Sequence, residues 1–290
     1  MESMRHAHIF DLPPEVIVRI LKEFDEQSLG RLRLVARYLN AIIEKHRSAL
    51  AKQSIYLAEF KENELVVERF LRRNRWEDYK YGITGRHIDS SVLRQLLCAN
   101  IDTVRFQVEL SDEAAVELAE RINALKSSVY RVYFSRCHLS PQSMISLLAV
   151  LHPQQVTIEF ESSEGFSMEA LCQDVNFREI KNLNLINSHL TDGDLRLITA
   201  EQLTVYEKSN LTLNGLREIL LEWYNGKRVI HDYHLSISER VVPESLFHGL
   251  PTRRRSVIAW ELRNPNTVLH VSIIGSGISI VKVFNVMELN

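Results

Sequence analysis

The sequence predicts an α/β protein in two unequal parts: a small N-terminal helical unit, then a longer region in which strands and helices alternate and which finishes in β strands. Three observations support this fold class. Apolar residues recur at helical spacing over the first forty residues. An apolar pattern then repeats several times along the middle of the chain. The stretch 267–284 alternates apolar and polar residues around two glycines, which is typical of two paired strands.

The helical unit opens with the stretch DLPPEVIVRILKEF, residues 11–24. Pro13 and Pro14 suit the first turn of a helix, where a missing N–H is tolerated, and Asp11 is a plausible cap. The apolar stripe that follows consists of Val16, Ile17, Ile20, Leu21 and Phe24. After a break with Ser28 as a second cap, it resumes at Leu29, Leu32, Val35, Leu39, Ile42 and Ile43. So small a unit rarely hides this much apolar surface by itself, so we expect part of it to pack elsewhere.

Residues 8–48 resemble an F-box. The motif begins Leu-Pro-x-Glu, continues with an Ile-Leu pair and reaches a Leu-x-x-Leu-x-x-Val stretch, and this chain follows it without a gap. The resemblance implies a three-helix unit that docks on a Skp1-like adaptor through Leu12, Pro13, Glu15, Ile20, Leu21, Leu29, Leu32, Val35 and Leu39. Leu39 stands where many F-boxes carry Trp, and we expect weaker packing there. Loss of Leu21 or Leu32 is expected to cost about 2 kcal/mol or more of adaptor binding.

Residues 49–82 are expected to form a helical linker, because apolar and charged residues alternate there in a helix-compatible way. The basic run RRNRW at 72–76 is interpreted as a solvated helix end. A nucleic-acid patch is the less favoured interpretation, since no second basic stripe supports it.

The remaining residues, 83–290, are expected to form one domain that resembles a leucine-rich repeat. VYRVYFSRCHL at 129–139 and IKNLNLINSHL at 180–190 fit the spacing L-x-x-L-x-L-x-x-N/C-x-L. Looser copies run over 101–110, 156–166 and 203–211. A small polar residue and a helix-compatible segment follow each copy, which predicts an irregular β/α solenoid. An ordinary α/β domain is the alternative that the uneven spacing leaves open.

The last part of the chain differs from these repeats. Residues 211–237 predict a helix, a turn at Asn225-Gly226 and a strand, and a hairpin follows around Gly275 and Gly277. This order resembles the associated region that follows the F-box in a large set of nematode F-box proteins.

The sequence does not assemble an acid, a base and a nucleophile, and we expect no cofactor or metal. His231 and His234 are three residues apart in a predicted strand and should face opposite sides. The basic cluster TRRR at 252–255 is interpreted as a solvated loop, with an acidic ligand as the alternative. Cys98, Cys137 and Cys172 lack paired spacing and are expected to be reduced and buried.

Bulk composition narrows the class of partner. The chain is 45% hydrophobic and 25% charged with a formal net charge of −2, so nothing favours a nucleic-acid or membrane partner. We expect an intracellular protein, in cytosol or nucleus.

The F-box resemblance implies a non-catalytic substrate-recognition subunit of an SCF-type (Skp1–cullin–F-box) ubiquitin ligase. Its partners would be a Skp1-like adaptor, through it a cullin, and a protein substrate. Two alternatives stay open: a repeat-domain scaffold or interaction protein without a ubiquitination role, and a repeat domain whose first helices are only its cap.

Overall fold

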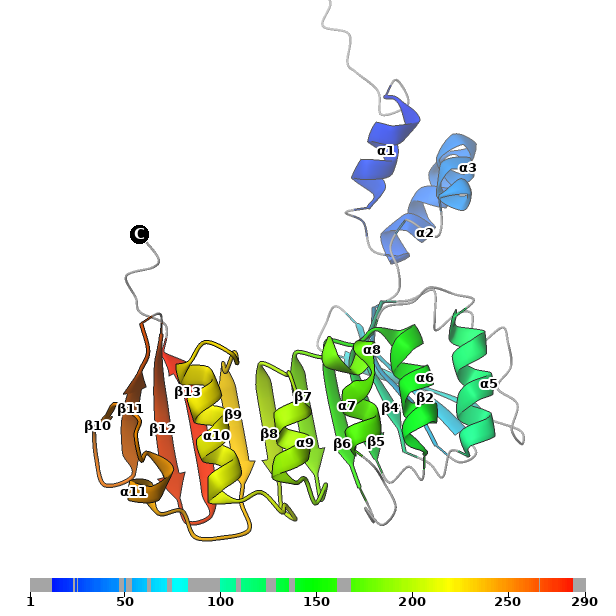
Figure 1. Ribbon diagram of the computed structural model, residues 1–290. Coiled ribbons are helices and arrows are strands. Elements are labelled where there is room, and N and C mark those ends of the chain that lie inside the picture. Colours follow the sequence, from blue (N-terminus) through cyan, green and yellow to red (C-terminus); the bar gives the residue numbers. More distant parts are fainter. Residues whose placement is uncertain are drawn as a thin grey trace, which may run out of the picture.

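The computed structural model describes residues 12–22, 24, 26–46, 50, 54–61, 64–71, 75–82, 100–107, 111–123, 129–135, 139–160, 168–265 and 267–283. Figure 1 shows three helices at the N-terminal end of the chain and a long mixed α/β region built on one large sheet.

The N-terminal unit consists of α1 (Pro14–Leu21), α2 (Glu26–Val35) and α3 (Arg37–Lys45). The three helices confirm the predicted helical unit. Ser28 does not cap the second helix, because α2 begins two residues earlier, at Glu26. Ala36 separates α2 from α3 in an extended conformation, so the chain turns there without a long loop.

These helices share a hydrophobic core of their own. Its buried members are Ile17, Leu21, Leu29, Leu39, Ile42, Ile43 and Leu50. Among the described residues, this cluster has no member in common with the much larger core of the sheet region. The unit therefore buries apolar surface internally, as an independent layer of packing.

The expected helical linker at 49–82 is wrong. The chain there forms the strands β1 (Ser54–Phe60), β2 (Glu64–Leu71) and β3 (Arg75–Gly82), and β2 pairs antiparallel with both β1 and β3. The register of β1 against β2 shifts between Ile55 and Leu57, which leaves Tyr56 as an extra residue. Such a bulge breaks the alternation of period two, and the broken pattern imitated helical spacing.

Strands and helices then alternate. The strands are β4 (Asn100–Phe106), β5 (Val129–Ser135), β6 (Gln155–Glu159), β7 (Asn182–Ile186), β8 (Gln202–Tyr206) and β9 (Asp232–Ser236). The helices are α5 (Asp112–Asn123), α6 (Pro141–Leu151), α7 (Met168–Gln173), α8 (Val175–Arg178), α9 (Asp192–Leu197), α10 (Leu213–Tyr224) and α11 (Pro243–Leu246). Each segment predicted as a repeat contains a strand, and a helix begins shortly after the segment ends. Membership of the leucine-rich-repeat family stays a prediction.

The predicted helix caps are present where the structure describes them. The Ser111 hydroxyl accepts from the Ala114 N–H, and the Ser140 hydroxyl from the Ser143 N–H, both at 3.3 Å. Thr191 and Thr212 cap α9 and α10 in the same way. These side chains satisfy N–H groups that have no partner inside the helix, which is why each helix begins beside a small polar residue.

The described strands form one sheet of 13, in the order β10-β11-β12-β13-β9-β8-β7-β6-β5-β4-β1-β2-β3. Strands β1, β4, β5, β6, β7, β8 and β9 are neighbours in this order, and they run parallel to one another. Antiparallel strands flank this group at both ends. Figure 1 shows helices α5 to α10 along one face of this sheet. The parallel arrangement follows from the helices, since each carries the chain back to the same end of the sheet.

Two apolar rows cross the sheet beneath the helices. One row continues from Ala58 through Val104, Val132, Val156, Leu183, Leu203 and Tyr233. In the other, Phe60, Phe106 and Phe134 stack at 5.3 Å between neighbouring ring centroids, and Ile158, Leu185 and Val205 continue it. All of these side chains are buried. Register between neighbouring strands is thus specified by side-chain packing.

The final strands are β10 (Thr252–Arg254), β11 (Ala259–Arg263), β12 (Val268–Ile274) and β13 (Gly277–Val283). The predicted hairpin is confirmed: β12 pairs antiparallel with β13, and Gly275 in the connecting turn has a φ of +63°. The interpretation of TRRR as a loop is wrong, since Thr252 to Arg254 form the outermost strand, paired with β11. All three residues of β10 are exposed, so no alternation of burial marked it as a strand.

Candidate functional site: an exposed apolar surface on the N-terminal helices

The prolines set where α1 begins. Pro14 occupies the first turn, and the carbonyl oxygen of Pro13 accepts from the N–H groups of Val16 and Ile17 at 3.0 and 3.1 Å. Glu15 lies in the first turn, where its charge is favourable toward the helix dipole. The cap expected from Asp11 lies outside the described residues. The double proline therefore fixes the direction in which the chain enters α1.

Several of the predicted adaptor-binding residues face inward. Leu21, Leu29 and Leu39 are buried members of the unit's own core, and Leu21 is only 1% exposed. Leu12 and Leu32 are partly buried and pack against that core. Ile20 is also partly buried. These six side chains shape the unit from within.

Other residues of the unit face outward. Of the predicted adaptor-binding residues, Pro13, Glu15 and Val35 are exposed. Leu34 is 88% exposed and Val35 is 71% exposed, at the end of α2, and Tyr38 at the start of α3 is exposed as well. We refer to Leu34, Val35 and Tyr38 as the α2–α3 surface. A leucine and a valine this exposed keep most of their contact with water after folding.

The sequence prediction missed Leu34 and Tyr38. The predicted stripe on α2 follows Leu29, Leu32 and Val35, at intervals of three residues. Leu34 lies five residues after Leu29 and therefore on a different side of the helix. A large apolar residue off the buried stripe is itself the signal that could have identified this surface.

Polar contacts hold the α2–α3 surface in place. Arg33 Nε donates to Asn40 Oδ1 at 3.0 Å, and the Arg33 guanidinium also pairs with Glu44. Arg33 belongs to α2, whereas Asn40 and Glu44 belong to α3. The Arg33 side chain thus joins α2 and α3, the two helices that carry the exposed residues. Exposed contacts of this kind stabilise little, but they reduce the freedom of the junction.

Comparison with known families bears directly on this unit. Residues 9–49 match the F-box-like family. The match has nearly the bounds predicted from the sequence, and it includes α1, α2 and α3. No curated protein matches the chain. The F-box-like unit is accordingly the part of the molecule for which a family relationship is established.

The sheet region presents a different surface on the face opposite its helices. Arg105 Nη1 donates to Glu59 Oε1 at 3.3 Å, and the Arg105 guanidinium carbon lies 5.0 Å from the centre of the Tyr133 ring. The Tyr133 hydroxyl and the Ser135 hydroxyl both donate to Glu159 Oε2, at 2.8 and 2.6 Å. Burial raises the pKa of Tyr133, and the hydrogen bond to Glu159 is the second largest cause of the rise.

Amide and hydroxyl side chains continue that face toward the C-terminal strands. Asn184 Nδ2 donates to Thr157 Oγ1 at 3.2 Å, and Asn182 Nδ2 donates to Gln202 Oε1 at 2.7 Å. These residues alternate along their strands with the buried apolar rows, so they point to the other side of the sheet. The open face is thus a polar surface whose side chains are tied to one another across strands.

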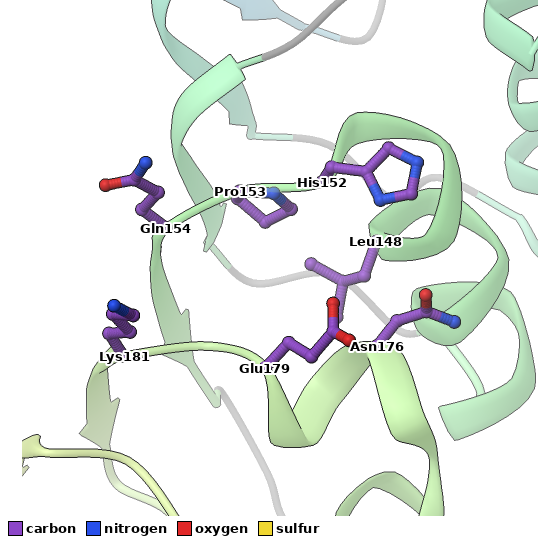
Figure 2. A pocket seen from close by; sticks show the side chains of 7 residues that line it. All are labelled: Leu148, His152, Pro153, Gln154, Asn176, Glu179 and Lys181. Atoms are coloured by element: carbon purple, nitrogen blue, oxygen red, sulfur yellow. The ribbon is translucent and has the colours of Figure 1, made fainter.

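A pocket of about 190 Å³ lies between α6, α8 and the segments that lead from these helices into β6 and β7 (Figure 2). It is lined by Leu148, His152, Pro153, Gln154, Asn176, Glu179 and Lys181. Small-molecule sites usually occupy about 300–1,000 Å³ and are mostly apolar. The pocket is smaller than that, and most of its lining residues are polar, so it does not resemble such a site.

The remaining sequence candidates have local structural partners. His231 Nδ1 is 3.0 Å from Glu201 Oε2, whereas His234 Nε2 is 3.0 Å from Asp232 Oδ1, so the two histidines contact different carboxylates. Cys172 is buried, and burial raises its pKa to about 12. Cys98 and Cys137 lie outside the described residues. A thiol with so high a pKa is a poor nucleophile.

The described residues contain no group of three or more His, Cys, Asp or Glu side chains arranged to hold a metal ion. The helices in this part of the chain are all too short or too polar to cross a bilayer.

Proposed function

We propose that the chain is a substrate-recognition subunit of an SCF-type ubiquitin ligase. The F-box-like unit would dock on a Skp1-like adaptor and through it on a cullin, and the sheet region would hold a protein substrate. F-box domains typically bind Skp1-like adaptors, and residues 9–49 match that family. That match is the observation that carries the proposal.

The α2–α3 surface supports adaptor docking physically. Leu34 and Val35 keep most of their apolar area in water, although Leu29 and Leu32 of the same helix pack inward. Large apolar side chains exposed together are typical of a surface that a partner covers. Within the predicted set, we assign direct contact with the adaptor to Pro13, Glu15 and Val35.

The other predicted residues act by shaping that surface. Leu21, Leu29 and Leu39 hold the three helices together, while Leu12, Ile20 and Leu32 lie at the boundary of the core. Truncation of Leu21 would thus weaken adaptor binding chiefly by loosening the unit. Val16, Leu34 and Tyr38 join the proposed contact set because they are exposed on the same helices.

The separate core of the F-box-like unit favours docking over a capping role. A terminal cap of a repeat domain covers the exposed end of the neighbouring repeat and shares its core. The described residues of α1, α2 and α3 instead form a cluster distinct from that of the sheet.

Substrate binding is proposed for the sheet region, which we interpret as leucine-rich-repeat-like. Its β/α alternation and the polar face opposite helices α5 to α10 support this role. In this proposal the subunit performs no chemistry. It raises the local concentration of substrate lysines near a ubiquitin-loaded enzyme by tethering.

The proposal is tested by co-purification. The full chain is expressed with a Skp1-like adaptor and a cullin, either unchanged or with Leu34→Asp and Val35→Asp together. The double variant should lose both partners, because burying two carboxylates in an apolar contact is strongly unfavourable. Val175→Asp with Val229→Asp, two exposed valines in the sheet region, is the matched control and should retain them.

Circular dichroism should find both double variants folded. Retention of the adaptor by the Leu34/Val35 variant would contradict docking through this surface. If the unchanged chain ignores the adaptor at micromolar concentration, the proposed function fails. Capture of the adaptor without any cullin would instead favour the scaffold alternative.

A further inference from the structure

The free edge of the sheet at β10 is rich in arginine. β10 is the last strand of the sheet, at its outer edge in Figure 1, and its three residues Thr252, Arg253 and Arg254 are all exposed. A strand at an edge presents backbone N–H and C=O groups that have no partner in the sheet.

The hydrogen-bond pattern identifies those groups. The Arg255 N–H donates to the Ala259 carbonyl at 2.9 Å, so these two residues form a hydrogen-bonded pair in the register of β10 against β11. Antiparallel pairs alternate, so Arg253 and Arg255 direct their backbone groups toward β11. Thr252 and Arg254 direct theirs outward. The edge therefore offers two donors and two acceptors at the spacing of an added strand.

The side chains around this edge carry an excess of positive charge. On the open face, Arg255 and Arg263 both donate to Glu261, a carboxylate only 2% exposed, and Arg253 lies opposite it in register. His270 Nε2 lies 3.9 Å from Glu261. The arginines hold the pKa of Glu261 below its usual range, so one negative charge faces three guanidinium groups.

Arg254 is held in position on the other side of the strand. Its guanidinium lies 5.9 Å from the centre of the Trp260 ring, and its Nε donates to the Ser256 carbonyl at 3.0 Å. Trp260 in turn contacts Phe247, with 5.5 Å between ring centroids. Among the described residues Arg253 makes no such contact, so its charge is available to a partner.

We propose that β10 binds an extended acidic peptide segment, which adds to the sheet as a further strand. Its backbone would pair with Thr252 and Arg254, and acidic side chains at alternate positions would all point to one face, opposite Arg253 and Arg255. Pairing of two β10 strands is disfavoured because it would place arginines beside arginines. The partner is therefore an acidic strand and not a second copy of this chain.

This proposal names a partner class for the substrate-binding region, and in that sense it rests on the proposed function. The test uses the purified full chain without adaptor, so its outcome is independent of adaptor docking. The probe is a short fluorescent peptide in which glutamate alternates with valine and threonine. Binding is followed by fluorescence anisotropy at two salt concentrations.

The unchanged chain should bind this peptide, and more weakly at higher salt. Arg253→Glu should weaken binding roughly tenfold or more, since it turns an attraction into a repulsion. Arg240→Glu, an exposed arginine between β9 and α11, is the matched control and should change the affinity less than about twofold.

Backbone pairing is tested separately. Thr252→Pro removes an outward N–H and no ladder hydrogen bond, so the chain should fold and lose the peptide. A peptide N-methylated at alternate amides should also fail to bind. The proposal is overturned if the Arg253→Glu variant binds the parent peptide as tightly as the unchanged chain does. It is also overturned if the unchanged chain binds the N-methylated peptide as tightly as the parent peptide, or does not bind the parent peptide at all.

Discussion

The F-box-like unit and the sheet region each bury an apolar core, but they differ in the surface that they leave beside it. The sheet places its apolar side chains in two buried rows under the helices and leaves a polar face, tied together by hydrogen bonds, on the other side. The small unit also has a buried core, yet it leaves Leu34, Val35 and Tyr38 in contact with water.

The difference indicates where a partner is needed. A unit of three short helices has little interior, so an exposed leucine and valine cannot be hidden without another surface. The large sheet buries two full rows of apolar side chains, and the exposed apolar residues of its region, such as Val257 at 77% and Ile274 at 71%, lie away from those rows. The proposed adaptor docking would cover the small unit's exposed residues, whereas the polar surfaces of the sheet region fit a more hydrophilic partner.

Phe106→Ala should have the largest effect on stability. Phe106 is buried and stacks between Phe60 and Phe134. Its truncation should destabilise the sheet region by about 3–5 kcal/mol, measured by urea unfolding. If the two cores are independent, adaptor binding at low urea should survive. Tyr130→Ala, at an exposed position of β5, is the control. Loss of adaptor binding at the urea concentration that unfolds the sheet region would show that the two cores are not independent.

Leu39→Ala should come next. Leu39 is buried in the core of the F-box-like unit, and its truncation should cost that unit about 2–4 kcal/mol. Adaptor affinity should fall because the helices loosen, and the helical circular-dichroism signal should fall with it. An unchanged signal combined with lost binding would mean that Leu39 contacts the adaptor directly.

The helical unit, the β/α alternation and the final hairpin could be predicted from the sequence because each leaves a periodic signal in consecutive residues. Strand β1 could not be predicted, because the extra residue Tyr56 shifts its alternation midway. Strand β10 could not either, since its stability depends on pairing with β11 and its own residues are all exposed.

The adaptor-binding residues stay a prediction. The motif positions lie on or beside the three helices, but a motif does not separate residues that pack inward from residues that are exposed. Leu21 and Val35 belong to the same pattern, and one is buried while the other is exposed. Only the packing of α1 against α3 and of α2 against α3 distinguishes them.

Gly215→Ala should destabilise the sheet region, although alanine normally favours a helix over glycine. A Cβ at position 215 would lie 2.1 Å from Asp192 Oδ1 and 2.8 Å from Asp192 Cβ. Asp192 accepts hydrogen bonds from the Thr212 N–H and hydroxyl at 2.9 and 2.6 Å, so it cannot move freely. We expect a loss of roughly 1–3 kcal/mol by thermal unfolding. A gain in stability would show that α9 and α10 can separate.

Glu261 should make the stability of the sheet region depend on pH. Hydrogen bonds from Arg263 and then Arg255 hold its pKa below the ordinary value of 4.5. Its contribution is therefore present above pH 4.5 and is lost as the pH falls through the lowered pKa. Glu261→Gln should flatten this part of the stability profile, measured by urea unfolding between pH 3 and 6. An unchanged profile would contradict the assignment.

Leu34→Ala should have the smallest effect on stability and still a large effect on binding. Because Leu34 is 88% exposed, we expect a change within about 0.5 kcal/mol in the free energy of unfolding. Adaptor affinity, measured by calorimetry, should fall by more than about 1 kcal/mol. Val229→Ala serves as the exposed control. A variant with normal affinity would remove Leu34 from the proposed contact.

Amide hydrogen exchange of the full chain, with and without a Skp1-like adaptor, tests the central claim most directly. The account predicts that the adaptor slows exchange in α1, α2 and α3, most strongly around Leu34 to Tyr38, and leaves strands β5 to β9 unchanged. Equal slowing in the sheet, or no slowing in the helices at saturating adaptor, would contradict it.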